Sequence, residues 1–340
     1  MRPFAYTRAE TIDEAVAMLA RDAASEATRP RALAGGTDLL TLMKGEIVNP
    51  VGLIDIKRLD GISDTIEQDA GYVRIGALTT LARIQNDPLI QKSHAALGEA
   101  ATVAASPQLR NMATIGGNLL QRPRCWYFRE DEVQCWLKGG DDCPAVEGEN
   151  QYHALFGDSP CHAVHPSDLA TALVALDASV IVHGSVGERS VPIGEFFALP
   201  SADRRIEHTL AVDDLIVAIT LPDHPATSRS TSTYLKAMER KVWAFALVGV
   251  GARLVIHNER ISEARLVLGG VSQIPWRVPE AESALIGAEP GSDLFARVAE
   301  IALRDAAPMS KNAYKIPLTK ALVTRALEAA SDTTEISTSQ

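Results

Sequence analysis

Residues 31–45 read RALAGGTDLLTLMKG, which predicts a β-strand, a glycine turn and a helix in immediate succession. The apolar run at 31–34 is typical of a short strand, and apolar residues from Leu39 to Met43 recur at helical spacing until Gly45 can end the helix. Glycine lets the backbone approach a ligand closely, and helix N-termini attract anions, so this turn is a candidate phosphate site. An ordinary tight turn has the same residues, and the G-x-G-x-x-G dinucleotide fingerprint is absent.

Outward from that turn, helix-like and strand-like patterns alternate along the chain, which indicates an α/β fold. Thr11 and Glu14 form a capping box at the start of the first expected helix. Helices are expected at 12–21, from 81, and at 94–105, 169–176, 280–285 and 318–329, and strands at 51–56, 72–77, 179–184, 190–193, 215–221, 245–255 and 261–268. The polar, breaker-rich residues 223–232 mark the best domain boundary, and residues 331–335 are expected to fray.

Length and charge set the broad class of the protein. A chain of 340 residues exceeds the usual size of a single core, so two or three domains are expected. The net charge is −10, and no block of Lys or Arg occurs, which argues against nucleic acid and anionic membranes as partners. We expect no secretory leader and no membrane-spanning helix, because no apolar stretch is long enough.

All four cysteines of the chain, Cys125, Cys135, Cys143 and Cys161, follow closely behind a second glycine turn, ATIGGN at residues 113–118. Thiolates bind both zinc and iron–sulfur clusters. The spacing C-x9-C-x7-C-x17-C lacks the C-x2-C pair of structural zinc sites and also differs from ferredoxin spacings. The spacing favours an iron–sulfur cluster over zinc, and zinc over two disulfides; four unrelated buried thiols are a further alternative.

The two glycine turns and a third motif together resemble a known family. Residues 34–40 (AGGTDLL), 109–119 (LRNMATIGGNL) and 166–170 (PSDLA) resemble the FAD-binding medium subunit of the xanthine dehydrogenase family of molybdenum hydroxylases, and residues 268–271, 275–277 and 312–315 resemble its C-terminal flavoprotein domain. The resemblance implies an FAD-binding portion of the vanillyl-alcohol-oxidase type, with α/β subdomains at 1–57 and 58–222. It also implies an iron–sulfur loop at 119–165 and a C-terminal α/β domain at 230–330.

The same resemblance implies which residues bind FAD, and it implies no substrate-hydroxylating residue in this chain. Leu33, Ala34, Gly35, Gly36, Thr37 and Asp38 would wrap the pyrophosphate, and Ala113, Thr114, Gly117 and Asn118 would line the path of the flavin and its phosphate. Asp168 would hold a ribose or adenine-side hydroxyl, Leu215 or Ile216 would contact the adenine, and Lys236 would reach the flavin or its phosphate. Without the family, Asp168 is a helix N-cap and Lys236 a solvated strand end.

Most members of the family lack the four cysteines. The chain is similar in this respect to the middle subunits of 4-hydroxybenzoyl-CoA reductase and, most of all, of bacterial aldehyde oxidoreductases of periplasmic type. That similarity implies that Cys125, Cys135, Cys143 and Cys161 bind a [4Fe–4S] cluster. His153, His162 and His165 are then expected to pack against the ligands or to hydrogen-bond to them.

The function implied by the resemblance is electron transfer within a heterotrimer. A large molybdenum-cofactor subunit would oxidise an aldehyde, a small [2Fe–2S] subunit would relay the electrons, and FAD on this chain would deliver them to an acceptor. Alternatives are the middle subunit of an N-heterocycle or aromatic-CoA enzyme, a self-sufficient flavin oxidoreductase, and a zinc-stabilised assembly subunit. The expected compartment is the cytoplasm, or the periplasm by export together with a signal-bearing partner.

Overall fold

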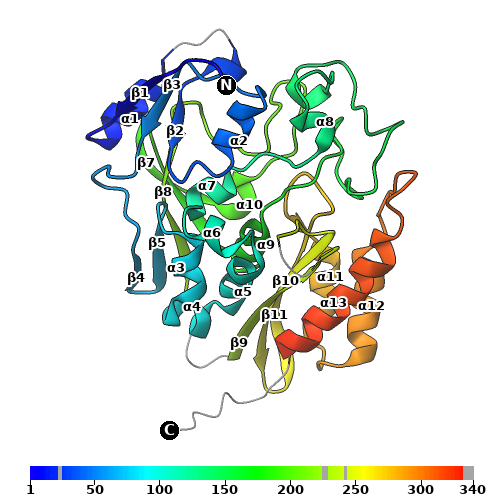
Figure 1. Cartoon of the computed structure of the whole chain (residues 1–340). Coiled ribbons are helices and arrows are strands. Elements are labelled where there is room, and N and C mark those ends of the chain that lie inside the picture. The colour runs from blue at the N-terminus through cyan, green and yellow to red at the C-terminus, as the bar shows by residue number, and fades with distance from the viewer. Residues whose placement is uncertain (22–24, 224–228, 241–242, 332–340) are drawn as a thin grey trace.

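The computed structural model describes residues 1–21, 25–223, 229–240 and 243–331. These residues form three β-sheets that follow one another along the chain (Figure 1). Helices pack against each sheet. A long and mostly irregular segment follows α7 (Ile115–Leu119) and leads to α9 (Asp168–Ala175), the helix at the centre of the molecule. The mixed α/β class expected from the sequence is therefore confirmed.

The first sheet is small and parallel, with strand order β1-β3-β2. Its strands are β1 (Ala5–Arg8), β2 (Arg31–Leu33) and β3 (Gly52–Asp55), and its helices are α1 (Ile12–Leu19) and α2 (Leu39–Lys44). The 3₁₀ helix η1 (Glu26–Thr28) precedes β2. Thr11 caps α1 by accepting a hydrogen bond from the Glu14 backbone N–H at 3.2 Å. The Glu14 carboxylate accepts from the Glu10 N–H, so only half of the expected capping box forms.

The second sheet is antiparallel, with strand order β4-β5-β8-β6-β7. Its strands are β4 (Ile66–Asp69), β5 (Tyr72–Gly76), β6 (Ser179–Gly184), β7 (Gly187–Pro192) and β8 (Leu215–Pro222). Its helices are α3 (Leu81–Asn86), α4 (Pro88–Ser93), α5 (Ala95–Val103), α6 (Pro107–Arg110), α7 (Ile115–Leu119), α9 (Asp168–Ala175) and α10 (Ile193–Phe196). All eight residues of α9 are buried, so this helix lies at the centre of the molecule.

The third sheet is antiparallel, with strand order β12-β11-β10-β9. Its strands are β9 (Arg229–Ala237), β10 (Val248–His257), β11 (Arg260–Gly269) and β12 (Trp276–Arg277), and its helices are α11 (Pro279–Leu285), α12 (Ser292–Ala302) and α13 (Lys315–Ser331). Val250, Ala252 and Leu254 point toward the core shared with α11, α12 and α13. Gly251 lies on the opposite face, against Thr171 of α9. This alternation gives β10 two buried faces.

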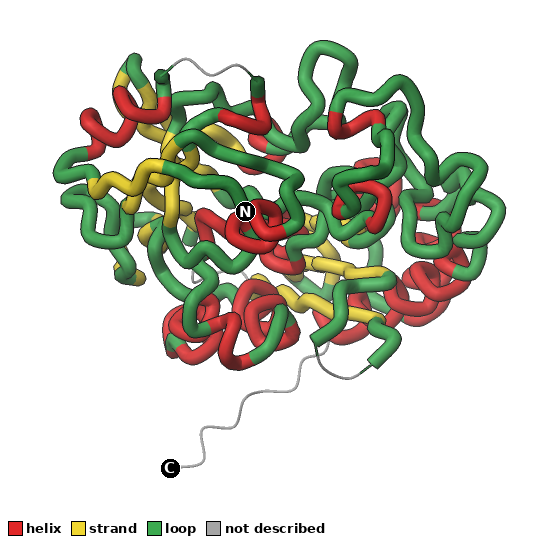
Figure 2. The backbone as a smooth tube through the Cα atoms, turned by 45° about the horizontal axis from the view of Figure 1, so that its top comes forward, coloured by secondary structure: helices red, strands yellow, loops and turns green. Residues whose placement is uncertain are grey.

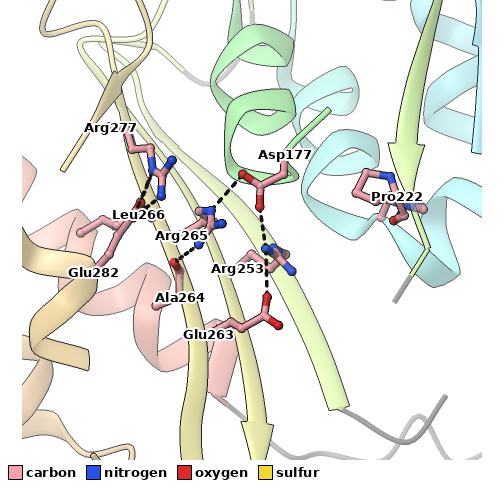
Figure 3. Close-up of polar contacts among 10 residues, drawn as sticks. Asp177, Pro222, Arg253, Glu263, Ala264, Arg265, Leu266, Arg277 and Glu282 are labelled. Carbon is pink, nitrogen blue, oxygen red and sulfur yellow. Dashed lines mark hydrogen bonds and ion pairs between the residues drawn. The ribbon is translucent and has the colours of Figure 1, made fainter. Parts of the chain in front are cut away.

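A polar contact connects α9 to the third sheet. Asp177, just beyond α9, accepts hydrogen bonds from Arg253 of β10 at 2.8 Å and from Arg265 of β11 at 2.9 Å (Figure 3). The Arg253 side chain is only 3% exposed, so this ion pair lies within the contact between the second and third sheets. Further along the same face, Arg277 and Glu282 pair at 2.7 Å.

The segment from 119 to 165, here called the cysteine loop, runs between α7 and α9 with little regular structure. Its described helices are α8 (Trp126–Arg129) and the 3₁₀ helix η2 (Trp136–Lys138). Most of it is drawn as loop in Figure 2. The loop packs on α2, because Leu42 and Met43 share a small apolar core with Phe128 and Trp136.

Most elements agree with the expectations from the sequence, and the differences have physical reasons. The polar residues 229–232, expected to be part of a linker, begin strand β9, which gains its partner from β10; residues 224–228 lie outside the described residues. β1 was missed because all four of its residues are exposed, and β4 because it is polar. The terminal helix extends from Lys315 to Ser331, and the fraying expected beyond it lies outside the described residues. Within the described ranges, no helix is both long and apolar enough to cross a membrane.

Candidate functional site

The two glycine turns meet in the structure. A Cβ atom added to Gly35 would stand 1.8 Å from the backbone carbonyl oxygen of Met112, next to Ala113 of the second turn. Only glycine tolerates that approach. Gly36 has φ +68°, which also favours glycine. The predicted backbone sites at 33–38 and at 113–118 are therefore brought together, although they are far apart in the sequence.

Asp168 and Lys236 form a buried ion pair beside these turns. Lys236 Nζ donates to Asp168 Oδ2 at 2.8 Å and to the carbonyl oxygen of Val103 at 3.2 Å. The Tyr234 hydroxyl donates to the other carboxylate oxygen at 2.5 Å. Burial raises the pKa of Asp168, while the charge of Lys236 and its hydrogen bonds oppose that rise.

This geometry corrects two expectations for the pair. The Lys236 side chain is 1% exposed, so it is not a solvated strand end. The helix N-cap is Ser167, whose hydroxyl accepts from the Ala170 N–H at 3.0 Å, so Asp168 is not the cap. The roles of Asp168 and Lys236 toward FAD stay predictions. The two side chains form one unit.

Asn118 connects the second glycine turn to this unit. The Ser167 hydroxyl donates to Asn118 Oδ1 at 2.5 Å, and Thr114 caps α7 by accepting from the Gly117 N–H at 3.3 Å. By contrast, Leu215 and Ile216 of β8 are 4% and 5% exposed and belong to the main apolar core. A contact between the adenine and these two side chains would require the core to open.

A cavity of about 500 Å³ lies against Asp168, within the size range of small-molecule sites. Its floor comes from α9 and from the end of β11. Its walls come from the cysteine loop and from the segment after β9. Its lining includes the side chains of Asp168, Cys125, His153, Arg124, Trp243 and Phe245. Aromatic and charged groups thus converge on a space that borders both the ion pair and the first cysteine.

The four cysteines gather in the cysteine loop, and all four are free thiols, so the two-disulfide alternative is wrong for this structure. Burial, with smaller contributions from Cys135 and Cys143, raises the pKa of Cys125 to about 11. Burial likewise raises the pKa of Cys161, with contributions from Cys143 and Cys125. Each sulfur therefore lies within electrostatic range of others. Backbone N–H groups oppose these shifts; one of them, that of Ala163, donates to Cys161 Sγ at 3.4 Å.

No three or more His, Cys, Asp or Glu side chains among the described residues are placed to hold one metal ion. That finding counts against a tetrahedral zinc site, in which four ligands surround a single point. A four-iron cubane spreads its ligand sulfurs over a larger body, so the same finding neither supports nor excludes it. His153 Nε2 lies 3.3 Å from Cys125 Sγ, which agrees with the expectation that a neighbouring histidine hydrogen-bonds to a cysteine.

Asp38 faces the cysteine loop. It occupies the N-cap position of α2, yet its carboxylate caps no N–H of that helix. A helix usually gains about 1 kcal/mol from such a cap. The carboxylate instead accepts from the Arg122 backbone N–H and from Arg129 Nη2, both at 2.9 Å, and from Arg124 Nη1. The sequence RPRCWYFR at 122–129 carries the signal that was missed, because three arginines around one cysteine need a carboxylate partner.

Two further residues escaped the sequence reasoning. The Lys315 side chain is fully buried, and its Nζ donates to the carbonyl oxygens of Tyr152 at 2.8 Å, of His153 at 3.0 Å and of Gly270 at 2.8 Å. Burial lowers the pKa of Lys315 to about 7. Asn312 donates to the His153 carbonyl oxygen at 3.1 Å. Residues 312–315 carried the family resemblance, but the loop carbonyls that they contact lie far away in the sequence.

Comparison with known proteins gives two family matches along the chain. Residues 2–224 match the FAD binding domain in molybdopterin dehydrogenase, and residues 233–330 match the CO dehydrogenase flavoprotein C-terminal domain. The aldehyde oxidoreductase FAD-binding subunit PaoB of Escherichia coli (strain K12) is 38% identical over 94% of this chain and 96% of its own length. The putative xanthine dehydrogenase FAD-binding subunit XdhB of the same organism is 28% identical over 90% of this chain and 87% of its own.

A solved structure has the same fold. In a carbon monoxide dehydrogenase from Hydrogenophaga pseudoflava that lacks the Mo-pyranopterin moiety of the molybdenum cofactor, one chain superposes with a TM-score of 0.75 at 26% identity. The match covers 97% of this chain and 98% of that chain. The [4Fe–4S] cluster stays a prediction.

Proposed function

This chain belongs to the family of FAD-binding subunits of molybdopterin dehydrogenases, and from that premise we propose that it is the electron-transfer subunit of a molybdenum hydroxylase. FAD bound here would supply the redox chemistry by accepting and releasing electrons. The main support is the meeting of the two glycine turns, together with the hydrogen bond that connects Asn118 of the second turn to Ser167, the neighbour of Asp168. The residues of this chain would bind and orient the cofactor and exclude water from it.

We propose that FAD extends from the glycine turns toward the cavity at Asp168. The backbone of the turns would approach the pyrophosphate where side chains are absent, and the Asp168–Lys236 unit would contact one part of the cofactor through both charges. The proposed contacts are Leu33, Ala34, Gly35, Gly36, Thr37, the backbone of Asp38, Ala113, Thr114, Gly117, Asn118, Asp168 and Lys236. Leu215 and Ile216 would contact FAD only through their backbone, because their side chains are in the core.

The purified chain should carry one FAD that is not covalently linked, because neither glycine turn supplies a His, Cys or Tyr to form a link. Acid precipitation should release the flavin into the supernatant, where its absorption measures it. Flavin that stays with the pellet contradicts this. Lys236→Met should lower the flavin content, because it leaves Asp168 buried without its cation. Lys320→Met, at a partly exposed pair on α13, is the matched control.

We further propose that Cys125, Cys135, Cys143 and Cys161 hold a [4Fe–4S] cluster. Four thiols that influence one another, with backbone N–H groups directed at the sulfurs, support this assignment. Cys135→Ser should remove most of the iron, because a hydroxyl oxygen is a poorer ligand for iron–sulfur clusters than a thiolate. FAD content, measured in the same sample, is the internal control. Equal iron in the variant and the parent excludes Cys135 as a ligand.

The partners and the substrate follow from the relatives. We propose a large molybdenum-cofactor subunit and a small [2Fe–2S] subunit as partners, with an aldehyde as the substrate of the complex, because PaoB belongs to an aldehyde oxidoreductase. An N-heterocycle is the second candidate, because a nicotinate dehydrogenase FAD-subunit of Eubacterium barkeri is 27% identical to this chain. Co-purified complex assayed with each substrate class separates the two.

We also propose three structural units: 1–57, 58–222 with the cysteine loop, and 230–330. Each would contain one of the three sheets, which supports the division. Expression of 230–330 alone tests it, because a unit with its own core should give a cooperative unfolding transition. The compartment is proposed to be the cytoplasm, or the periplasm if a partner carries the export signal, and fractionation of cells that make the whole complex decides between them.

A further inference from the structure

We infer that the side chain of Asp38 is a positioning residue that holds the cysteine loop against the first glycine turn, and that it is not a contact to FAD. The contacts of Asp38 with Arg122, Arg124 and Arg129 are here called the clasp. Asp38 stands at the N-cap position of α2 but makes no capping hydrogen bond. An aspartate at an N-cap normally accepts from a helix N–H group. The Asp38 carboxylate accepts none from α2 and is directed at the loop.

The Asp38 carboxylate accepts hydrogen bonds from the loop on both sides of Cys125. Arg122 and Arg124 precede that cysteine, and Arg129 follows it. Asp38 accepts from the backbone N–H of Arg122 and from the guanidinium groups of Arg124 and Arg129. Arg129 also donates to the carbonyl oxygens of Pro123 and Arg122, both at 2.8 Å. The short helix α8 begins directly after Cys125, and these contacts attach both to α2.

Charge balance makes the clasp depend on Asp38. The side chains of Arg122, Arg124 and Arg129 are 14%, 28% and 19% exposed. The carboxylates that pair with them are Asp38 and Glu207, the latter 3.1 Å from Arg122. If Asp38 lost its charge, Arg124 and Arg129 would be left close together and poorly hydrated, and their mutual repulsion would push the loop away.

The clasp also reaches the cavity and the apolar core under the loop. Arg124 stands over the ring of Phe245, 4.9 Å from its centroid, and both residues line the cavity at Asp168. Just below Asp38, Leu42 and Met43 of α2 pack in the same core as Phe128 and Cys135 of the loop. A single carboxylate therefore connects the glycine turn, the cysteine loop and the segment after β9.

The test is Asp38→Asn in the complete chain, a change that keeps the shape and removes the charge. Amide hydrogen exchange of residues 122–130 should accelerate about tenfold or more, the size expected when hydrogen bonds to a charged group are lost. FAD content should fall only together with faster exchange, because the loop lines the cavity at Asp168. Asp13→Asn is the matched control, because its side chain is 90% exposed and pairs only with His183 among the contacts described. It should leave exchange at 122–130 unchanged.

A triple variant separates the loss of these contacts from any general damage. In a background that carries Arg124→Gln and Arg129→Gln, Asp38→Asn should cause little further acceleration, because both guanidinium partners are already gone and the backbone N–H of Arg122 can still bond to the amide oxygen. Full additivity overturns the inference, and so does unchanged exchange in Asp38→Asn alone. Loss of FAD without faster exchange at residues 122–130 also overturns it, because that result makes the Asp38 side chain a cofactor contact.

The consequence for iron rests on the proposed function. If the loop holds a cluster, Asp38→Asn should also lower the iron content of the chain. The two ideas fail separately. A parent protein without iron refutes the cluster and leaves the exchange measurement to decide about Asp38. Iron in the parent that survives in Asp38→Asn, together with unchanged exchange, refutes the clasp and leaves the cluster standing.

Discussion

The cysteine loop and the third sheet both bury backbone, but they satisfy it in different ways. In the sheet, β10 bonds to β9 and β11 over its whole length, with backbone groups that every residue type supplies. In the loop, side chains from distant parts of the chain supply the donors. Arg205 donates to the carbonyl oxygens of Trp136 at 2.6 Å and Gly140 at 2.8 Å.

The contrast teaches where a single substitution matters. Buried carbonyl groups need a donor, and a ladder provides one whatever the side chain is. When the carbonyl groups of a loop depend on individual Arg, Asn and Lys side chains, no other donor replaces a side chain that is substituted. We therefore expect the loop's distant donors to be more sensitive to substitution than charged residues on the sheet and its outer helices.

Replacing Lys315 by Met should cause the largest loss in the comparison. The change leaves the carbonyl oxygens of Tyr152 and Gly270 without this donor in a buried site. We expect the free energy of unfolding to fall by about 3 to 5 kcal/mol, measured by chemical denaturation. Lys320→Met, on an exposed face of the same helix, should cost about 0.5 kcal/mol or less. An equal loss of unfolding free energy in the two variants would contradict the distinction between the cysteine loop and the sheet with its outer helices.

Acid should destabilise the protein next in order of size. Burial lowers the pKa of His165 to about 3 and that of His208 to about 3. The unfolded chain therefore binds more protons than the folded one below pH 6.5, so the stability is complete above that pH and is lost as the pH falls toward 3. Each histidine should account for about 3 kcal/mol between pH 6.5 and 4.

His208→Phe tests this contribution, because a phenyl ring can keep the stacking on Phe196 and does not titrate. The variant should lose less stability than the parent when both are denatured at pH 6.5 and at pH 4. His257→Gln, at an exposed position on β10, should follow the parent. A parent-like slope in His208→Phe would show that this imidazole does not titrate as described.

The smallest effect is expected at the contact between α9 and the sheet. Asp177→Asn weakens the pairs with Arg253 and Arg265, and Asp177 is itself about one third exposed. We expect a loss of about 1 to 2 kcal/mol in the free energy of unfolding, which should shrink in high salt. Glu289→Gln, at an exposed pair with Arg260, should change it by about 0.5 kcal/mol or less. A loss at Asp177 as large as that at Lys315 would contradict the order.

Much of the fold could be predicted from local pattern. The strand, glycine turn and helix at 31–45, the buried helix after Pro166 and the strands at 179–184 and 215–221 all have apolar periodicity that the structure uses. The start of β9 could not be predicted, because residues 229–232 are polar and their strand form depends on pairing with β10. Local sequence contains no sign of a partner that comes later in the chain.

The site was predictable in its residues and less so in its geometry. Asp168 and Lys236 were both singled out, yet only the fold shows that they pair and that Lys236 is buried. The family resemblance implies that Asp38 contacts the pyrophosphate, but it gives no sign that the carboxylate faces arginines more than eighty positions away. Lys315 lay in a motif without a role, because its carbonyl partners leave no mark on the sequence.

The central claim, that this chain carries electrons and does not oxidise substrate by itself, is tested most directly by the flavin spectrum. The purified subunit is mixed anaerobically with an aldehyde, then with dithionite, and the experiment is repeated with the co-purified molybdenum-cofactor and [2Fe–2S] subunits. The account expects bleaching by dithionite but not by aldehyde in the lone subunit, and bleaching by aldehyde in the complex. Bleaching of the lone subunit by aldehyde would contradict it and would favour a self-sufficient flavin oxidoreductase.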